Sequence, residues 1–430
     1  MPNVRGWLVG AAGVGLFVAG LLFGAQPLEQ VGFGLIVLVI GAVAVVRLGR
    51  HDLEITRTVS PERARAGQPV QVTLRFTNRG RGSAPLMLLE DRLPKGLAGR
   101  GRFTLNGVEP EGRREVSYQV VAHQRGLYEV GPLSARMVDP FSLAQLGARV
   151  APSTTLMVHP KIEKLTLPQD QGEKRSAQSS ALRQLSGGRG EEFYTLREYA
   201  QGDDLRKVHW ASTAKRGRYM IRQEETPWHT RATVVIDDRR WAHDRFGDSS
   251  SFERAVEAAA SVLSLYQSAG YGFRLIGVHS AILSSGRGVG QMHQCLDHLS
   301  MLRPLGDQDE ESLLLGRLGE IEGRGIAEAT LILIGGTIPD SAAIGLARLK
   351  RLFRQVIVVS FPAHRFSSDS TKARWEGEKQ TVEISRLLNR SGVRTVVLGP
   401  GDALAPAWSS LSSTRMRGGD AGWAPKPELV

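Results

Sequence analysis

The sequence predicts a multidomain protein in which an N-terminal transmembrane helical hairpin precedes a β-sandwich-like middle domain and a C-terminal α/β domain. Three observations predict this architecture: two uncharged apolar runs near the N-terminus, short alternating strands after them, and then strands that alternate with amphipathic helices. At 430 residues the chain is also too long for one ordinary core. We expect the anchor over residues 1–50, the β-sandwich-like domain over 51–165, the α/β domain over 166–411 and a disordered tail over 412–430.

The two apolar runs predict a pair of membrane-spanning helices. Residues 7–25 are 19 uncharged residues, close to the ~20 that cross a hydrocarbon core as a helix. Residues 26–30 include a proline and polar side chains and are expected to form the turn, and residues 31–46 give the second span. A cleaved signal peptide is the alternative, but it would have a shorter apolar region and no second run. Gly20 and Gly24 would let a second helix backbone approach the first span closely.

The charges beside these runs predict their orientation. Arg5 precedes the first span, Arg47 and Arg50 follow the second, and the connecting turn carries only Glu29. Cytoplasmic flanks are enriched in Lys and Arg, so we expect two spans in the inner or plasma membrane with both termini cytoplasmic.

The net charge of +12 raises the question of nucleic-acid binding. The basic residues are interleaved with acids, however, as in Arg197-Glu198, and they form neither a run of five like charges nor an aromatic ladder. We therefore expect no nucleic-acid partner and attribute the charge to a position beside an anionic leaflet. The single cysteine, Cys295, cannot form an internal disulfide, which is consistent with a reducing compartment.

The middle of the chain has the sequence pattern of an antiparallel β domain. Residues 70–76 alternate apolar and polar side chains and are followed by a turn at Asn78-Arg79-Gly80. Further short strands are expected at 86–89, 115–121 and 155–158. A structural platform between membrane and distal domain is the favoured interpretation, and a spacer or adhesion module is the alternative.

The distal part alternates apolar strands with helices, which predicts a parallel sheet covered on both faces. The expected strands are 233–236, 273–278, 330–334, 356–360 and 395–398, and the expected helices are 252–268, 291–302, 310–322, 341–353 and 382–389. Ligands of such sheets bind outside the carboxyl ends of the strands, so the segment Asp237-Asp238-Arg239-Arg240-Trp241 is the place to look.

A polar motif lies just before this sheet. Its residues are Arg197-Glu198-Tyr199, Gly202-Asp203-Asp204, Arg206, His209, Trp210, Ala214 and Arg222. Two interpretations stay open, a partner-binding surface or a structural network, since buried Arg and Asp are normally paired.

This stretch closely resembles the central motif of the family called domain of unknown function 58. Two upstream segments also resemble that family's patterns: Arg125-Gly126-Leu127-Tyr128, and Asp139-Pro140-Phe141-Ser142-Leu143 with Ser142 in place of a glycine. The resemblance implies a bacterial membrane protein whose distal domain is von Willebrand factor A-like. It also implies partners: a MoxR-type AAA+ ATPase and possibly a transglutaminase-like membrane protein.

The resemblance further implies a position for a metal ion. A von Willebrand factor A domain often binds Mg²⁺ through Asp-x-Ser-x-Ser after its first strand. Here Asp237, Arg239 and Trp241 occupy those positions, so neither hydroxyl is present and Arg239 adds positive charge. We expect a degenerate site that holds no metal, and we expect no cofactor.

Two functional classes follow. The first is a non-enzymatic interaction or scaffold protein that works with the ATPase in assembly or maturation of a client. The second is an unrecognised hydrolase that uses Asp203, Asp204 and His209. The sequence contains no Walker A loop, His-Glu-x-x-His or Gly-x-Ser-x-Gly motif, so the first is favoured.

Overall fold

The computed structural model describes most of the chain as two compact units. The described residues are 2–48, 53–82, 84, 87–105, 107–139, 141–168, 194–198, 208, 210–224, 231–243, 250–280, 282–306, 310–323, 330–367 and 371–411. One unit comprises Met1–Lys161 with Leu296–Met301, and the other comprises Ile162–Cys295 with Leu302–Val430.

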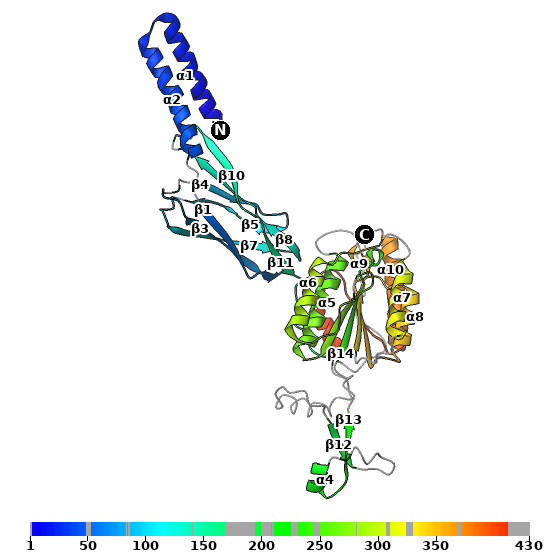
Figure 1. The fold of residues 1–430 in the computed structure, drawn as a ribbon. Helices are drawn as coiled ribbons and strands as arrows, with labels where there is room; N and C mark the ends of the chain where they lie inside the picture. The colour runs from blue at the N-terminus through cyan, green and yellow to red at the C-terminus, as the bar shows by residue number, and fades with distance from the viewer. Residues whose placement is uncertain are drawn as a thin grey trace. The chain divides into compact units, whose positions relative to one another are not determined.

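The first unit begins with two antiparallel helices, α1 (Val4–Phe23) and α2 (Gln26–Leu48), which are labelled in Figure 1. Both helices are long and apolar enough to cross a membrane. The expected turn over residues 26–30 is wrong, because the helices are separated by Gly24 and Ala25 alone. Gly24 ends α1 in the left-handed conformation at φ 68°, and Pro27 lies in the first turn of α2, where a missing N–H has no helical partner to lose.

Glycines allow the two helices to approach closely. A Cβ atom on Gly32 would lie 2.5 Å from the backbone nitrogen of Phe17, and one on Gly20 would lie 2.7 Å from that of Glu29. Gly13 also faces α2 and is separated from Gly20 by seven residues, the spacing of one helix face. Gly24, in contrast, meets nothing within 4 Å, so only Gly20 of the expected glycine pair contributes to packing.

The rest of this unit is a set of mainly antiparallel sheets. The strand orders are β1-β3-β7-β5, β10-β9-β4-β6 and β2-β11-β8, with β2 parallel to β11. The strands are β1 (Leu53–Ser60), β2 (Arg63–Arg65), β3 (Pro69–Asn78), β4 (Met87–Asp91), β5 (Leu97–Gly99), β6 (Arg102–Leu105), β7 (Arg113–Ala122), β8 (Gly126–Val130), β9 (Leu133–Val138), β10 (Gln145–Ala151) and β11 (Thr154–His159). Side chains of the two four-stranded sheets share one apolar cluster, which includes Leu74, Phe76, Met87 and Leu133. The two sheets therefore pack face to face.

A buried ion pair lies inside this β region. Arg57 donates from Nη2 to Asp91 Oδ1 at 2.6 Å and from Nε to Oδ2 at 3.2 Å, and both side chains are almost fully buried. Tyr118 Oη donates to Asp91 Oδ2 at 2.6 Å, and Arg57 Nη1 donates to the Val130 carbonyl at 3.1 Å. Burial and the hydrogen bond to Asp91 raise the pKa of the Tyr118 phenol, so it stays protonated as a donor. The network joins four strands, β1, β4, β7 and β8.

The second unit contains a five-stranded parallel sheet, as predicted. Its strand order is β15-β14-β16-β17-β18. The strands are β14 (Arg231–Ile236), β15 (Gly272–Gly277), β16 (Thr330–Gly335), β17 (Gln355–Ser360) and β18 (Arg394–Val397). The helices are α5 (Ser251–Ser268), α6 (Gly288–Met301), α7 (Glu310–Gly323), α8 (Asp340–Leu349), α9 (Ala363–Phe366), α10 (Thr371–Arg390) and α11 (Leu404–Ser410). The order of strands reverses between β14 and β16, the position where open α/β sheets bind ligands.

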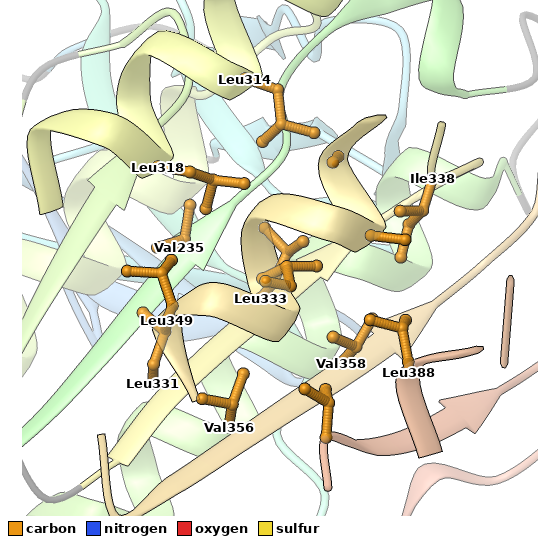
Figure 2. Packing of buried hydrophobic residues seen from close by; sticks show 14 of the residues in the cluster. Val235, Leu314, Leu318, Leu331, Leu333, Ile338, Leu349, Val356, Val358 and Leu388 are labelled. Atoms are coloured by element: carbon orange, nitrogen blue, oxygen red, sulfur yellow. The ribbon is translucent and has the colours of Figure 1, made fainter. Parts of the chain in front are cut away.

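Helices cover both faces of this sheet. Side chains from α7, α8 and α10 pack against one face, where Val235, Leu333 and Val358 lie side by side (Figure 2). The helix α5 covers the other face and contacts β14, β15 and β16 (Figure 1). Burial on both faces explains why these strands are continuous apolar runs in the sequence.

The largest difference from the sequence prediction in this unit is α10. It begins at Thr371, whereas we expected a helix over residues 382–389. The first half is almost entirely polar and exposed, and only Ile384 and Leu388 are buried. An apolar repeat is therefore present only in the second half, which is the part that packs on the core.

We expect Asp91→Ala to destabilise the β region by about 3–5 kcal/mol, because it leaves the Arg57 guanidinium buried without its carboxylate. The measurement is hydrogen exchange at the amides of β3 and β7. Glu90→Ala is the matched control: its ion pair with Arg102 is exposed, so the expected change is within about 0.5 kcal/mol. Equal protection of these amides from exchange in the two variants would show that the buried pair contributes nothing to the stability of the β region.

Candidate functional site

The carboxyl end of β14 forms the candidate site. Asp237, Asp238 and Arg239 follow the strand directly and are all buried. The neighbouring strand β16 ends beside them at Gly335, since Ile236 pairs with Ile334. Three ionisable side chains therefore lie at the point where the strand order reverses.

Asp237 and Arg239 form a buried bidentate ion pair. Arg239 Nε donates to Asp237 Oδ1 at 2.8 Å, and Nη2 donates to Oδ2 at 2.8 Å. The Arg239 backbone N–H also donates to Oδ1, at 3.2 Å. Both carboxylate oxygens are therefore occupied by a cationic group of the same chain, in the geometry that gives the strongest charge-assisted hydrogen bonds.

Asp238 has a structural role in the next connection of the sheet. Its Oδ1 accepts the backbone N–H of His279 at 2.7 Å, and its Oδ2 accepts that of Ser280 at 2.9 Å. These residues follow β15, so the carboxylate satisfies the backbone donors of the turn after that strand. A Cβ atom on Gly277 would overlap Ser280 Oγ and would lie 3.1 Å from Asp238 Oδ2, so this turn leaves little room for a side chain at the end of β15.

His243 fixes the backbone beneath the ion pair. Its Nε2 lies 2.7 Å from the Asp237 carbonyl, and its Nδ1 lies 3.1 Å from Ser251 Oγ. A carbonyl oxygen only accepts, so Nε2 carries the proton and Nδ1 accepts from the serine hydroxyl. Burial lowers the pKa of His243, which keeps the ring neutral and preserves this arrangement.

The end of β16 packs tightly against this segment. A Cβ atom on Gly335 would lie 2.5 Å from the Asp237 Cβ, and one on Gly336 would overlap the Ala242 carbonyl. The Ala242 carbonyl also accepts the Thr337 N–H at 2.7 Å. Only glycine fits at these two positions, so backbone atoms fill the space beside Asp237.

These residues do not fit a Mg²⁺ ion. The Asp237 oxygens that would face a cation already bind the Arg239 guanidinium, and Trp241 offers no oxygen and is 59% exposed. Within the described ranges, no group of three or more His, Cys, Asp or Glu side chains could hold a metal ion. The degenerate site stays a prediction, and the Asp237–Arg239 pair supplies its physical reason.

Part of the polar motif forms a separate hairpin. Strands β12 (Tyr194–Glu198) and β13 (Met220–Glu224) pair so that Arg197 lies opposite Ile221 and Arg222 opposite Leu196. Between them, α4 (Trp210–Arg216) begins with Trp210, which is exposed and packs edge-to-face on Tyr219. Along the chain, β13 leads to the amino end of β14, whereas Asp237 follows its carboxyl end.

The remaining motif positions lie outside the described residues. They are Tyr199, Gly202, Asp203, Asp204, Arg206 and His209. Both roles considered for them, partner binding and the hydrolase cluster, stay predictions.

The sequence indicated Asp238 by its place after the strand, but it gave no sign of the roles of His243 and Ser251. His243 follows the 3-10 helix Arg240–Ala242 and Ser251 begins α5, so spacing along the chain did not reveal that His243 joins Ser251 to the Asp237 carbonyl. The pair Gly335-Gly336 was a usable signal, because two glycines at the end of an apolar strand indicate a close backbone approach.

The geometry defines a parallel α/β domain whose ligand edge is closed by its own ion pair. Residues 195–365, from β12 into α9, match the family model described as "Protein of unknown function DUF58". The match bears out the expected resemblance to this family over those residues. The "Uncharacterized protein YeaD" of Bacillus subtilis (strain 168) is 24% identical over 272 residues, which is 62% of this chain. The match spans 66% of that protein's length.

Two solved structures each match about a quarter of the chain. The CARDB domain of a Pyrococcus furiosus protein is 14% identical and matches 25% of this chain and 88% of its own, with a TM-score of 0.19. The GAE domain of a Saccharomyces cerevisiae protein is 14% identical. It matches 24% of this chain and 88% of its own, with a TM-score of 0.17. These scores carry no argument about fold or function.

We expect isothermal titration of the protein with Mg²⁺ to give no heat of tight binding, because Arg239 occupies the Asp237 carboxylate. Asp237→Ala is the control. Tight binding that disappears in this variant would contradict the prediction.

We expect the α/β unit to lose stability as the pH falls below about 6.5, the ordinary pKa of histidine. The folded-state pKa of His243 is lowered, so the unfolded chain takes up a proton first and stability falls towards the folded pKa. The slope from one group is at most about 1.4 kcal/mol per pH unit. The free energy of unfolding should depend less on pH in His243→Gln. Its pH dependence should stay unchanged in His293→Gln, which alters an exposed histidine. If the free energy of unfolding depended on pH in the same way in the unchanged protein and in both variants, the prediction would be contradicted.

Proposed function

We propose that this chain is a membrane-anchored, non-enzymatic interaction protein whose α/β unit presents a docking surface in the cytoplasm. The observation that carries the proposal is the closed carboxyl edge of the sheet. The Asp237–Arg239 pair and the close approach of Gly335 fill the position where a ligand would bind. What remains accessible beside this edge is a surface suited to a macromolecule.

Trp241 is the centre of that surface. It lies in the short 3-10 helix after Arg239 and is 59% exposed. Leu305, also exposed, is held alongside because its N–H donates to the Asp238 carbonyl at 2.9 Å and its carbonyl accepts from Arg240 N–H at 3.1 Å. Tryptophan next to a rigid backbone is the kind of residue that contributes most energy to protein interfaces.

The proposed partner is a MoxR-type AAA+ ATPase, with a transglutaminase-like membrane protein as a possible neighbour. The family resemblance supports this choice, together with the proposal that the sheet is von Willebrand factor A-like. The parallel sheet and an aspartate directly after its first strand are consistent with that fold.

The proposed orientation has both termini in the cytoplasm. Two apolar helices joined by a two-residue turn require both ends of the hairpin to lie on one side if it crosses the bilayer. Basic residues at both ends of the hairpin, Arg5 in the first turn of α1 and Arg50 after α2, favour the cytoplasmic side.

Binding of a purified MoxR-type ATPase to sealed membrane vesicles tests partner and orientation together. We expect binding to inverted vesicles and none to right-side-out vesicles. Trp241→Ala should weaken binding by about tenfold or more, equivalent to ~1.4 kcal/mol, because it removes the exposed aromatic anchor.

Trp375→Ala is the matched control, since Trp375 on α10 is 65% exposed, close to the 59% of Trp241, and lies away from β14 in the chain. Equal binding of the ATPase by both variants would show that Trp241 is not part of the interface. Absence of binding in either vesicle orientation, with turnover on a panel of hydrolase substrates, would favour the enzyme instead.

A further inference from the structure

The loop between β9 and β10 is described at Asp139 and at residues 141–144, and one carboxylate binds its backbone. Asp139 is buried, and its Oδ1 accepts the N–H groups of Leu143 and Ala144 while its Oδ2 accepts that of Phe141 at 2.9 Å. Ser142 adopts a φ of 54°, in the left-handed region that costs a non-glycine residue about 1–2 kcal/mol. The hydrogen bonds to Asp139 offset this cost, so the loop has a defined shape.

This loop is attached to the base of the helical hairpin. Asn3 donates its backbone N–H to the Leu143 carbonyl at 2.9 Å and its side-chain Nδ2–H to the Ser142 carbonyl at 2.6 Å. A Cβ atom on Gly6 would overlap the Leu143 carbonyl, so the loop backbone lies directly against α1.

Apolar side chains of the loop also pack on α2. Leu143 and Ala144 form one cluster with Ala42 and Val46. Val9 of α1 and Leu38 and Val39 of α2 pack against the same cluster. Ala42 and Leu38 belong to the part of α2 that is apolar enough to cross a membrane, so the loop contacts the spans themselves.

The length of α1 gives the depth of this contact. Its 20 residues extend for ~30 Å at ~1.5 Å each, which equals the thickness of a hydrocarbon core. Asn3 caps the first turn, with Oδ1 accepting the Gly6 N–H at 2.9 Å, and therefore marks one boundary of the core. Arg5 and Trp7 are exposed at the same level, as expected for residues at a membrane interface.

Phe141 lies in this loop, two residues before Leu143, and its side chain is 64% exposed. We propose that the loop inserts into the interfacial layer of the bilayer, with Phe141 as the side chain that enters the lipid. The proposal rests on the proposed function, in which the hairpin spans the membrane. It gives the β region a second contact with the bilayer and fixes its tilt relative to the spans.

Lipid is the occupant that the surroundings support. The exposed aromatic side chain is continuous with helices that the bilayer would surround, and an aromatic ring placed at headgroup depth is stabilised there. Arg5, which is exposed and precedes the Gly6 that lies against the loop, favours anionic headgroups at this level.

Spin labels at single introduced cysteines test the insertion. The full chain carrying Phe141→Cys is labelled, reconstituted into vesicles of phosphatidylcholine and phosphatidylglycerol, and assayed for accessibility to oxygen and to a water-soluble nickel chelate. The native Cys295 is fully buried and burial raises its pKa to about 12, so its thiol reacts slowly. We expect a several-fold higher oxygen-to-nickel ratio at position 141 than at an aqueous site.

Two further positions supply the controls. Leu127→Cys on β8 and Val14→Cys on α1 change residues that are each 52% exposed, the first in the β region and the second in the middle of a span. If the label at position 141 has the accessibility of the label at 127, while the label at 14 is in lipid, the loop insertion alone is overturned. An aqueous label at 14 would overturn the anchor, and the loop insertion with it.

Discussion

The α/β unit depends on the buried ion pair between Asp237 and Arg239. An aspartate at the end of a central parallel strand would be costly if its charge were left without a partner in a low-dielectric interior. Arg239 offsets that cost by pairing with the carboxylate. Because it is only two residues along the chain, its backbone N–H binds the same carboxylate. The pair thereby bends the chain after β14 into the short helix that carries Trp241.

The neighbouring groups maintain this bend. His243 binds the Asp237 carbonyl, and Gly335 and Gly336 at the end of β16 leave room for the folded-back segment. A buried ion pair of this kind adds little net stability compared with an apolar core, but removal of one partner is strongly destabilising. The arrangement therefore specifies one conformation of the edge, which a docking surface needs and a site with an exchangeable ligand would not provide.

Much of the fold was predictable from the sequence because burial imposes periodicity. Strands such as β14 and β16 are buried on both faces and appear as continuous apolar runs, and β3 is buried on one face and alternates. The turn of the hairpin was misplaced because Pro27 is compatible with the first turn of a helix as well as with a loop. The first half of α10 was missed because its exposed side chains leave no apolar repeat.

The candidate site was predictable only in position. The rule for parallel sheets indicated the end of β14, and the residue types at 237 and 239 suggested that a metal would be disfavoured. The bidentate geometry, the neutral His243 and the Gly335 contact depend on how separate strands meet, which no local pattern encodes. The motif hairpin shows the converse case, since Arg197 and Arg222 are close in register although 25 positions apart in the chain.

The close glycine contacts of the hairpin also limit how this protein can associate sideways in a bilayer. The small-residue surface formed by Gly13, Gly20 and Gly32 is already covered by the chain's own second helix. Any lateral neighbour must therefore meet the outer surface, where Leu21 and Phe33 are exposed and where Gly34 and Gly41 have nothing within 4 Å of an added Cβ atom. Gly34 and Gly41 are seven residues apart and share one face of α2, so a second helix has room to approach the hairpin closely there.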